Sequence, residues 1–300
     1  MTLVDIEGHE LKLSNLDKVL YPATGFTKGE VIDYYARIAP TMLPHLHGRA
    51  ITLKRYPNGV DGKFFYEKNC PKHRPDWIGI SSVQAEDGPI GYCDLDSVAA
   101  VVWAANLAAL ELHTTMSRAA KPELPTMVVF DLDPGAPADI LECADIGLWI
   151  RDILDGLGLQ CVAKTSGSKG LQVYLPINTK TDYEHTTTFA KALAEIMERQ
   201  APDKVVSVQR KELRVGKVLV DWMQNSFHKT TVCAYSLRAR EQPTVSTPVS
   251  WREVERCHDE RDRALLTFTA PEVLDRVEKL GDLWAPTLEL KQKLPTPPDS

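Results

Sequence analysis

The sequence of 300 residues lacks long hydrophobic runs, and no stretch approaches the roughly 18 apolar residues that a membrane-spanning helix needs. It also lacks a secretory leader, because its first twenty residues are acidic and interrupted by polar positions. The six cysteines show no C-x-x-C spacing, which is typical of reduced thiols rather than of a disulfide framework. Cys70 and His73 have the spacing of metal ligands, but no second pair follows, so a loop cysteine and a surface histidine are favoured over zinc. These absences predict a cytoplasmic protein with no membrane partner.

An overall positive charge is absent too, since the formal net charge is −6. The charge is nevertheless uneven along the chain. Residues 44–75 carry seven Lys or Arg against two acids, and residues 204–240 carry eight against two. Two basic segments in an acidic protein indicate a groove for a polyanion, and a solvated surface is the ordinary alternative.

Hydrophobic spacing predicts an α+β fold. A helix is expected over 28–46, where prolines end it, and a core helix over 96–113. Two amphipathic helices are expected over 139–157 and 182–200. Short β-rich runs between and after them predict strands over 126–133, 160–166, 171–177, 204–210 and 217–223. The close spacing of the later strands favours hairpins, and therefore a mixed or antiparallel sheet flanked by helices. No internal linker divides the chain, which predicts a single domain over 1–290 and a disordered tail or linker over the proline-rich 291–300.

Two aspartates follow the apolar run in "VVFDLDPG". Asp131 and Asp133 are two residues apart, so a strand would point both to the same face. Asp221 is a third acid inside an apolar run, "VLVDW", where an unpaired buried carboxylate would cost several kcal/mol. Three carboxylates on neighbouring strand ends predict a site for two divalent ions about 4 Å apart. Loop capping by aspartate is the alternative, and it is favoured for the second D-x-D motif, Asp94 and Asp96, which precedes a helix.

Other polar groups are candidates for binding phosphate. The turn "KTSGSKG" places Ser166, Ser168 and Lys169 where backbone N–H groups can hold phosphate oxygens, and a plain polar hairpin turn is an equal alternative. It is not a Walker A loop, because no earlier glycine has the required spacing and no helix follows. Cations that flank Asp221 in sequence, Arg214 among them, suit a triphosphate, although a salt-bridged surface explains them nearly as well. His113 is expected at the end of the core helix, where a purely structural role is the alternative.

Aromatic residues stand inside the first basic segment. Phe64 and Phe65 in "KFFYEKN" indicate a stacking platform for a base, with at most one of them exposed, and core packing of both is the stronger alternative. Near the start of the chain, Asn15, Lys18 and Lys28 surround a predicted turn that suits one anion.

These segments together resemble the polymerase domain of the bacterial ATP-dependent DNA ligase D, in the archaeo-eukaryotic primase superfamily. The resemblance covers nearly the whole chain and rests on seven segments in order. They are "NLDKVLYPATG", "TLKRYPNGVDG", "FFYEK", "FDLDPG", "TSGSKGL", "KVLVDW" with "QN", and "KTTVCAYSLRAR". It implies a primase-polymerase fold with an N-terminal DNA-binding part over about 1–115 and a catalytic core over about 116–245.

The resemblance also implies a function. It implies template-directed nucleotidyl transfer, with a preference for ribonucleotides, that fills gaps at DNA breaks in end joining or repair. Asp131, Asp133 and Asp221 would hold two Mn²⁺ or Mg²⁺ ions. The residues implied to contact the incoming NTP or dNTP are Lys54, Arg55, Phe64, Phe65, His113, Ser166, Lys169, Arg214, Gln224 and Arg238. Asn15, Lys18 and Lys28 would grip a 5′-phosphate on gapped or broken duplex DNA.

The implied partners are such DNA and an end-joining ligase or end-binding protein, in a bacterial or archaeal cytoplasm at the nucleoid. The initial Met and the Pro-rich tail favour a free protein over an excised domain. One residue departs from the family pattern, because Gln172 stands where the family commonly has His, and Gln cannot carry a positive charge. Two rival functions remain. A haloacid dehalogenase-type phosphatase expects a D-x-D-x-T-like continuation, which "DLDPG" lacks, and a non-catalytic DNA-end binding module would not need all three acids.

Overall fold

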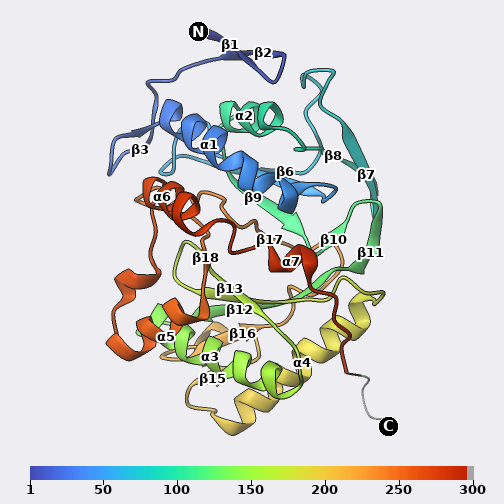
Figure 1. Ribbon diagram of the computed structural model, residues 1–300, viewed down its shortest axis with the longest axis vertical. Coiled ribbons are helices and arrows are strands. Elements are labelled where there is room, and N and C mark those ends of the chain that lie inside the picture. Colours follow the sequence, from blue (N-terminus) through green and yellow to red (C-terminus); the bar gives the residue numbers. More distant parts are fainter. Residues whose placement is uncertain (296–300) are drawn as a thin grey trace. The chain divides into compact units, whose positions relative to one another are not determined.

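The computed structural model describes residues 1–295 and divides into two units (Figure 1). The first unit consists of residues 1–120, 230–246 and 268–282. The second consists of residues 121–229 and 247–267 and the chain from residue 283 onward. Each unit is therefore built from three segments that are distant in sequence. No helix in the described part of the chain is long and apolar enough to cross a membrane.

The first unit contains short hairpins, a four-stranded sheet and three helices. Its elements are β1 (Thr2–Ile6), β2 (His9–Leu13), β3 (Val19–Tyr21), β4 (Phe26–Thr27), α1 (Lys28–Leu46), β5 (Ile51–Arg55), β6 (Phe65–Glu67), β7 (Ile80–Ala85), β8 (Gly88–Cys93), α2 (Val98–Asn106), β9 (Ala109–Thr115), β10 (Ser117–Arg118), β17 (Thr230–Val232) and α6 (Ala270–Leu280). The larger sheet has the order β17-β9-β5-β6, and every pairing in it is antiparallel.

Helix α1 confirms the helix predicted over 28–46. It begins at a capping box in which the Thr27 hydroxyl accepts from the Glu30 N–H, at 3.2 Å, and the Glu30 carboxylate accepts from the Thr27 N–H, at 2.7 Å. The expectation that prolines end this helix is wrong, because Pro40 and Pro44 both lie inside it. Each proline removes one backbone donor, and the neighbouring turns of this largely buried helix keep it intact.

The helix predicted over 96–113 is wrong in its second half. Helix α2 ends at Asn106, and Ala108 takes a left-handed conformation with φ of 58° that turns the chain into strand β9. His113 therefore lies on a strand and not at the end of a helix. At the other end of α2 the predicted cap is confirmed, because the Ser97 hydroxyl accepts from the Ala100 N–H at 3.1 Å.

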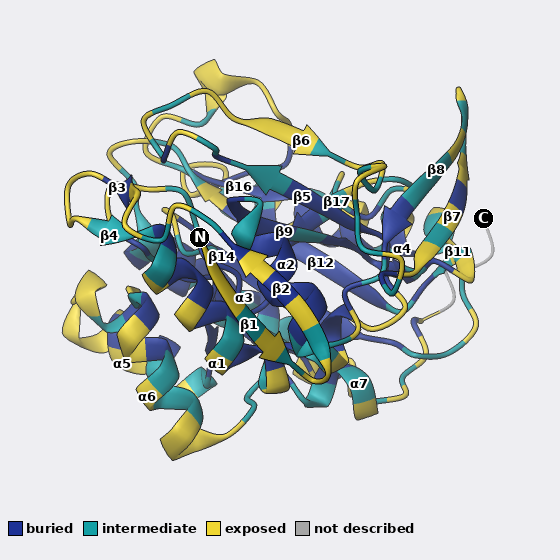
Figure 2. Cartoon of the chain, turned by 90° about the horizontal axis from the view of Figure 1, so that it is seen from above, coloured by how far each residue is buried: buried dark blue, intermediate teal, exposed yellow. Residues whose placement is uncertain are grey.

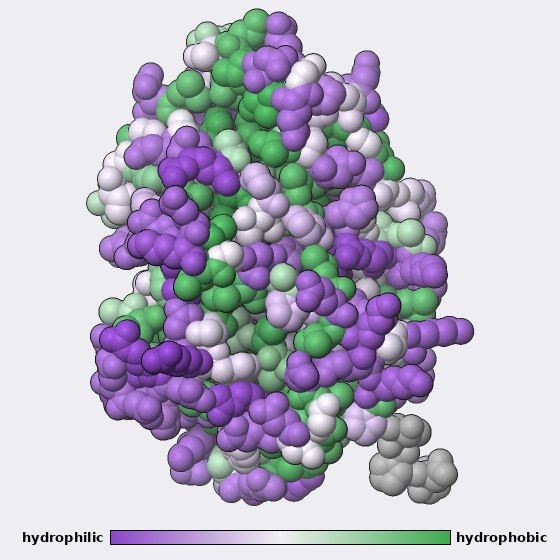
Figure 3. Space-filling view, viewed as in Figure 1, coloured by the Kyte–Doolittle hydropathy of each residue, from purple (hydrophilic) through white to green (hydrophobic). Residues whose placement is uncertain are grey.

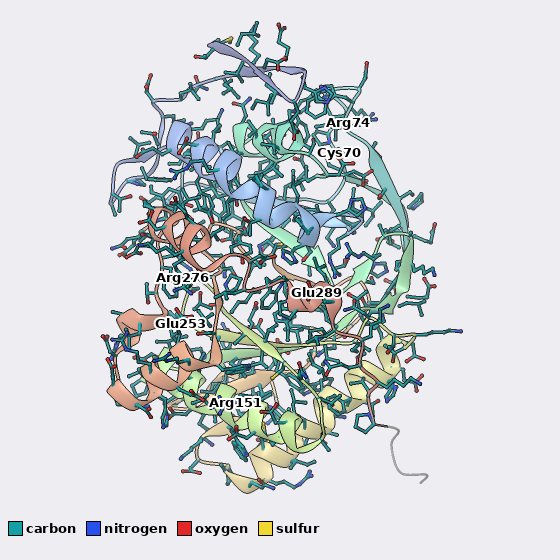
Figure 4. The ribbon with its side chains drawn as sticks, viewed as in Figure 1. Cys70, Arg74, Arg151, Glu253, Arg276 and Glu289 are labelled. Carbon is teal, nitrogen blue, oxygen red and sulfur yellow. A yellow bond between two sulfur atoms is a disulfide. The ribbon has the colours of Figure 1, made fainter. Side chains whose placement is uncertain are left out.

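A disulfide joins Cys70 to Cys93, so the expectation that all cysteines are reduced is wrong (Figure 4 labels Cys70). The two Cα atoms are 4.8 Å apart, within the range that the bond requires. The sequence carried no sign of this pair, because 23 residues separate the cysteines and the backbone alone brings them together. Cys93 ends strand β8, and the Cys70 N–H donates to the Gly91 carbonyl of the same strand at 2.6 Å.

The second unit contains a six-stranded sheet with helices packed on it. Its elements are β11 (Lys121–Pro125), β12 (Met127–Pro134), α3 (Ile140–Gly156), β13 (Val162–Thr165), β14 (Leu171–Pro176), α4 (Tyr183–Gln200), β15 (Val205–Val206), the 3₁₀ helix η1 (Lys211–Leu213), β16 (Val218–Asp221), β18 (Pro248–Val249), α5 (Trp251–Glu260), the 3₁₀ helix η2 (Arg263–Leu266) and α7 (Pro286–Glu289). The strand order is β15-β16-β12-β14-β13-β18. All pairs are antiparallel except β15 with β16, which confirms the predicted mixed sheet.

Helix α3 covers one face of this sheet. A Cβ added at Gly147 of α3 would come within 2.7 Å of the Leu171 side chain, with Leu132 and Val173 next nearest at 3.7 Å. Because side chains alternate along a strand, the neighbours of these residues, such as Asp131 and Gln172, point to the opposite face. Strand β12 is buried at Met127–Phe130 and Leu132 and appears mostly dark blue in Figure 2, whereas β6 of the first unit is largely exposed and yellow.

The surface mixes ion pairs with small hydrophobic groups. Hydrophilic and hydrophobic residues are interspersed over the face shown in Figure 3. Arg151 of α3, labelled in Figure 4, pairs with Asp152 at 3.0 Å and with Glu255 of α5 at 2.5 Å.

At the chain's end, residues 291–295 of the predicted tail form no helix or strand. The Gln292 amide donates to the carbonyls of Gln160 and Pro176, at 2.9 and 2.7 Å. The rest of the predicted tail, 296–300, lies outside the described residues.

Candidate active site

Three aspartates meet on the face of the second unit's sheet that α3 leaves open. Asp131 of β12 lies directly opposite Asp221 of β16 on one side and Gln172 of β14 on the other. Asp133 is two residues farther along β12 and points the same way. The structure thus brings together, across two neighbouring strands, the three acids that the sequence singled out.

Amide donors hold Asp221, which is only 4% exposed. Its Oδ1 accepts from the Met223 N–H at 2.9 Å. Its Oδ2 accepts from the side-chain amides of Gln209 and Gln224, at 2.9 and 3.0 Å. Gln224, which the family resemblance assigned to the nucleotide, therefore contacts Asp221 here. Gln209 was missed in the sequence, where nothing distinguishes it from other polar loop residues.

The environment of Asp131 disfavours its charge. Burial raises the pKa of Asp131 to about 7, and the charge of Asp133 and then that of Asp221 act in the same direction. A hydrogen bond from the Gln172 side chain and the charge of Lys164 oppose this shift without cancelling it. A buried carboxyl group with two further carboxylates beside it forms a natural site for a cation.

Lys164 is a buried lysine that no sequence pattern singled out. It is 1% exposed on β13, directly opposite Gln172 of β14. Its ammonium group donates to the Gln172 side-chain oxygen and lies 5.5 Å from the centre of the Tyr174 ring. Gln172 therefore accepts from a lysine and donates to Asp131, a role that uses both ends of its amide.

The donor set fits a hard divalent cation, since carboxylate oxygens are the ligands that Mg²⁺ and Mn²⁺ prefer. In the described residues, no three His, Cys, Asp or Glu side chains already surround a common point as metal ligands. The Asp221 oxygens accept from three N–H donors. A metal would compete with these neutral donors, and its positive charge would oppose the burial and the neighbouring negative charges that raise the pKa of Asp131.

The predicted turn between two strands is confirmed, and it lies against the backbone of β12 at Leu132, between Asp131 and Asp133 in sequence. A Cβ at Gly170 would come within 2.0 Å of the Leu132 carbonyl oxygen, so only glycine permits this approach to β12. Inside the turn, the Ser166 hydroxyl accepts from the N–H groups of Ser168 and Gly170, at 3.2 and 3.1 Å. Lys169 is exposed at its tip.

A second glycine brings Arg214 to the other side of β12. A Cβ at Gly135 would come within 2.0 Å of the Arg214 carbonyl oxygen. The Arg214 side chain donates from Nη2 to the Gln209 carbonyl at 2.8 Å, and its Nε is buried without a hydrogen-bond partner among the described residues. The Nε–H of Arg214 is therefore available to a ligand, and Arg214 also contacts Gln209, whose side chain donates to Asp221.

In the first unit, one buried carboxylate gathers three of the predicted nucleotide-binding residues. Glu111 of β9 is 1% exposed. Its Oε2 lies 2.8 Å from His113 Nε2 and 3.6 Å from Lys54 Nζ, and its Oε1 lies 3.4 Å from Arg238 Nε. The Ala239 N–H also donates to Oε1, at 3.1 Å. Glu111 was missed in the sequence although an acid within the apolar "LELH" gave the same signal that revealed Asp221.

These contacts set the charges of the group. Burial raises the pKa of Glu111, but the hydrogen bond from His113 and the charges of Arg238, His113 and Lys54 outweigh it and leave the pKa below its ordinary value. Burial lowers the pKa of His113, and Glu111 only partly offsets this. An ionised carboxylate only accepts, so His113 Nε2 carries the proton and Nδ1 of the neutral ring is an acceptor.

Aromatic rings surround the Lys54 ammonium group. It lies 4.5, 5.3 and 5.5 Å from the ring centres of Phe64, Tyr56 and Tyr66. Phe65, on the neighbouring position, packs on Arg55 at 5.1 Å. The interpretation of both phenylalanines as core residues is wrong, and so is the expectation that one points inward. Phe64, which precedes strand β6, is 50% exposed, and Phe65, the first residue of that edge strand, is 44% exposed.

The third predicted group, Asn15, Lys18 and Lys28, also lies in the first unit. The Lys28 N–H donates to the Lys18 carbonyl at 2.8 Å, and the Lys18 N–H to the Asn15 carbonyl at 3.0 Å, which fixes the turn against the start of α1. Burial lowers the pKa of Lys28 to about 8, and the charges of Lys18 and Arg55 add to this. An anion bound among these cations would reverse that shift, so the group suits a phosphate.

Comparisons with known proteins agree on one family. The family model described as "LigD, primase-polymerase domain" matches residues 27–284. The multifunctional non-homologous end joining DNA repair protein LigD of Mycobacterium tuberculosis is 42% identical over 279 residues, which cover 90% of this chain and 36% of that protein. The bifunctional non-homologous end joining protein LigD of Bacillus subtilis is 31% identical over 273 residues, which cover 91% of this chain and 43% of that protein. The chain thus spans well under half the length of these relatives.

A solved structure is similar over nearly the same range. It is described as the polymerase domain from Mycobacterium tuberculosis ligase D in complex with DNA, and it is 40% identical in sequence. The TM-score is 0.84, and the match covers 91% of this chain and 96% of that one.

Proposed function

The chain belongs to the LigD primase-polymerase domain family, and from that premise we propose that it is a template-directed nucleotidyltransferase that fills gaps at DNA breaks. The resemblance drawn from the seven sequence segments is confirmed, as is the primase-polymerase fold. The observation that carries the proposal is the set of three aspartates on one sheet face, with Asp131 and Asp221 directly opposite each other.

Asp131, Asp133 and Asp221 are the residues that would hold two Mn²⁺ or Mg²⁺ ions. When bound, such ions lower the pKa of an attacking hydroxyl and stabilise a leaving pyrophosphate. The chain's own contribution is to fix the carboxylates. Gln172 orients Asp131, and Gln209 and Gln224 orient Asp221.

The remaining candidates divide by chemistry. In the second unit, Ser166, Lys169 and Arg214 offer hydrogen-bond donors and positive charge that suit a triphosphate. In the first unit, Lys54, His113 and Arg238 offer donors and charge that suit a phosphate or sugar of an NTP or dNTP. Phe64 and Phe65 are both exposed, each with a cation over its ring, and one of them is proposed to stack on the base. Ribonucleotides are the preferred substrates in this proposal.

Asn15, Lys18 and Lys28 are proposed to bind the 5′-phosphate at a gap or break. The Mycobacterium tuberculosis polymerase domain is described in complex with DNA, and we extend that partner to this chain as gapped or broken duplex. An end-joining ligase and an end-binding protein are the proposed functional partners, because the relatives carry end joining in their names. We also propose that the protein acts in the bacterial cytoplasm, at the nucleoid, where such DNA would be found.

Extension of a labelled primer across a one-nucleotide gap with a 5′-phosphate tests the proposal. We expect addition of the templated nucleotide, faster with NTPs than with dNTPs, and release of pyrophosphate. Release of inorganic phosphate from the nucleotide without extension would instead favour a phosphatase. Tight DNA binding without any addition, in Mn²⁺ and in Mg²⁺, would favour a non-catalytic end-binding module.

A further inference from the structure

Glu111 is a buried acid that none of the sequence motifs marked. Glu111 is only 1% exposed, and burying a carboxylate this deeply is costly unless hydrogen-bond donors and positive charges surround it. The compensation here comes entirely from residues proposed to bind the nucleotide or adjacent to one. The two carboxylate oxygens of Glu111 lie 2.8–3.6 Å from nitrogen atoms of four groups: the side chains of His113, Lys54 and Arg238 and the backbone N–H of Ala239.

The backbone accounts for this convergence. Glu111 and His113 are two residues apart on β9 and therefore point to one face. Lys54 of β5 is directly opposite Glu111, and Thr52 is directly opposite His113. Arg238 follows β17, the strand that pairs with β9 on its other side. Glu111 thus contacts side chains from three separate segments of the first unit.

The group retains an excess of positive charge. Lys54 and Arg238 carry two positive charges, and Glu111 neutralises one of them. This balance leaves out His113, whose pKa is lowered by burial. The side chains of Lys54, His113 and Arg238 remain 13–14% exposed, whereas that of Glu111 is 2% exposed. A ligand can therefore reach the three surrounding groups but not the carboxylate that holds them.

We propose that Glu111 is the positioning residue of the nucleotide-binding group, fixing where Lys54, His113 and Arg238 present their polar atoms. This inference rests on the proposed function. A purely structural role, in which Glu111 only supports the fold of the sheet, is the alternative. The two differ in what a substitution changes: a positioning role alters the affinity for the nucleotide, and a structural role alters stability alone.

The test compares Glu111→Gln and Glu111→Asp with the unmodified chain. Gln keeps the shape and one acceptor but removes the charge, while Asp keeps the charge on a shorter side chain. Steady-state extension of a gapped primer gives KM for the NTP and kcat. Gel-shift binding of the same DNA without nucleotide tests whether the DNA contacts are kept, and thermal unfolding reports stability. Thr52→Val is the matched control, because Thr52 is equally buried on the facing strand and its hydroxyl has no hydrogen-bond partner among the described residues.

For Glu111→Gln we expect KM for the NTP to rise roughly 10- to 100-fold, the range found when a residue that orients a ligand-binding group is removed. DNA binding should be unchanged, and kcat at saturating NTP should fall less than KM rises. Glu111→Asp should recover part of the loss, and Thr52→Val should leave KM unchanged.

Two results would overturn the inference. The first is an unchanged KM in Glu111→Gln together with a lowered melting temperature, which would show that Glu111 only supports the fold. The second applies if Glu111→Gln does not fold, and it is a KM in Glu111→Asp equal to that of the unmodified chain. Failure of the unmodified chain to extend any primer would instead reject the proposed function, so the two failures are distinguishable.

Discussion

Asp131 and Asp221 are directly opposite each other on the antiparallel strands β12 and β16. Like charges at such positions repel and destabilise a sheet. Burial raises the pKa of Asp131, and the charges of Asp133, on the same face, and of Asp221 add to this. The three aspartates therefore lower the stability of the metal-free protein. The same concentration of negative charge is what the proposed reaction needs to bind metal ions.

The repulsion predicts how the stability of the metal-free protein varies with pH. Asp131 holds its proton up to about pH 7 in the folded chain, but an unfolded aspartate loses it near pH 4. The folded state binds more protons in this window, so the free energy of unfolding should fall as pH rises from about 4 to about 7. Asp131→Asn should remove that component and be more stable by about 1 kcal/mol at pH 8. Urea unfolding in EDTA measures this, with exposed Asp96→Asn as the control, and equal pH slopes in the two variants would contradict it.

Gln172 is predicted to matter through both ends of its amide. Gln172→Leu leaves the buried Lys164 ammonium without this acceptor and should destabilise the protein by about 1–3 kcal/mol. Gln172→Glu keeps the acceptor but brings a negative charge to Asp131, so its loss of stability should grow as pH rises. Urea unfolding at pH 5 and pH 8 separates the two. A Gln172→Glu variant with no greater pH dependence than the unmodified chain would show that this residue does not face Asp131.

The disulfide predicts a thiol count. In protein purified without reductant and then denatured, only the four cysteines outside the disulfide should react with a thiol reagent: Cys143, Cys161, Cys233 and Cys257. Reduction should lower the free energy of unfolding by about 3 kcal/mol, because the bond closes a loop of some twenty residues. Cys70→Ser with Cys93→Ser should reproduce the loss and become insensitive to reductant. Six reactive thiols in the oxidised sample would contradict the pairing.

Lys28 predicts a pH dependence for the use of a 5′-phosphate. Its ammonium group loses its proton near pH 8, so the rate advantage of a phosphorylated gap over an unphosphorylated one should shrink as pH rises through that value. Lys18→Ala should reduce the same advantage about tenfold, equivalent to about 1.4 kcal/mol. Lys12→Ala, at an exposed lysine of β2, is the control. A phosphate advantage that Lys18→Ala leaves intact would place the phosphate elsewhere.

The sequence identified the three aspartates of the candidate site but not the residues that contact them. The position of an acid within an apolar strand is a local signal, and it identified Asp131, Asp133 and Asp221. The same signal at Glu111 was obscured because "LAALELH" is compatible with a helix, and only the left-handed Ala108 turns it into a strand. Partners such as Gln209, Lys164 and Cys93 depend on strand order and register, which no local pattern encodes.

Exposure was equally hard to predict for Phe64 and Phe65. Adjacent residues on a strand point to opposite faces, and in a central strand one of them would be buried. Strand β6 begins only at Phe65, so the alternation does not apply to this pair, and both rings are exposed. Where β6 begins is set by its pairing with β5 and not by the segment alone.

The most direct test of the central claim is single-turnover extension of a primer on a 5′-phosphorylated one-nucleotide gap, with Mn²⁺ and NTPs. It compares Asp131→Asn, Asp133→Asn and Asp221→Asn with Asp96→Asn, an aspartate of the second D-x-D motif that serves as the matched control. We predict that each of the first three loses incorporation by several orders of magnitude while still binding the gapped DNA, and that Asp96→Asn matches the unmodified chain. Incorporation at the normal rate by Asp131→Asn and Asp221→Asn would contradict the claim that these opposed carboxylates carry the reaction.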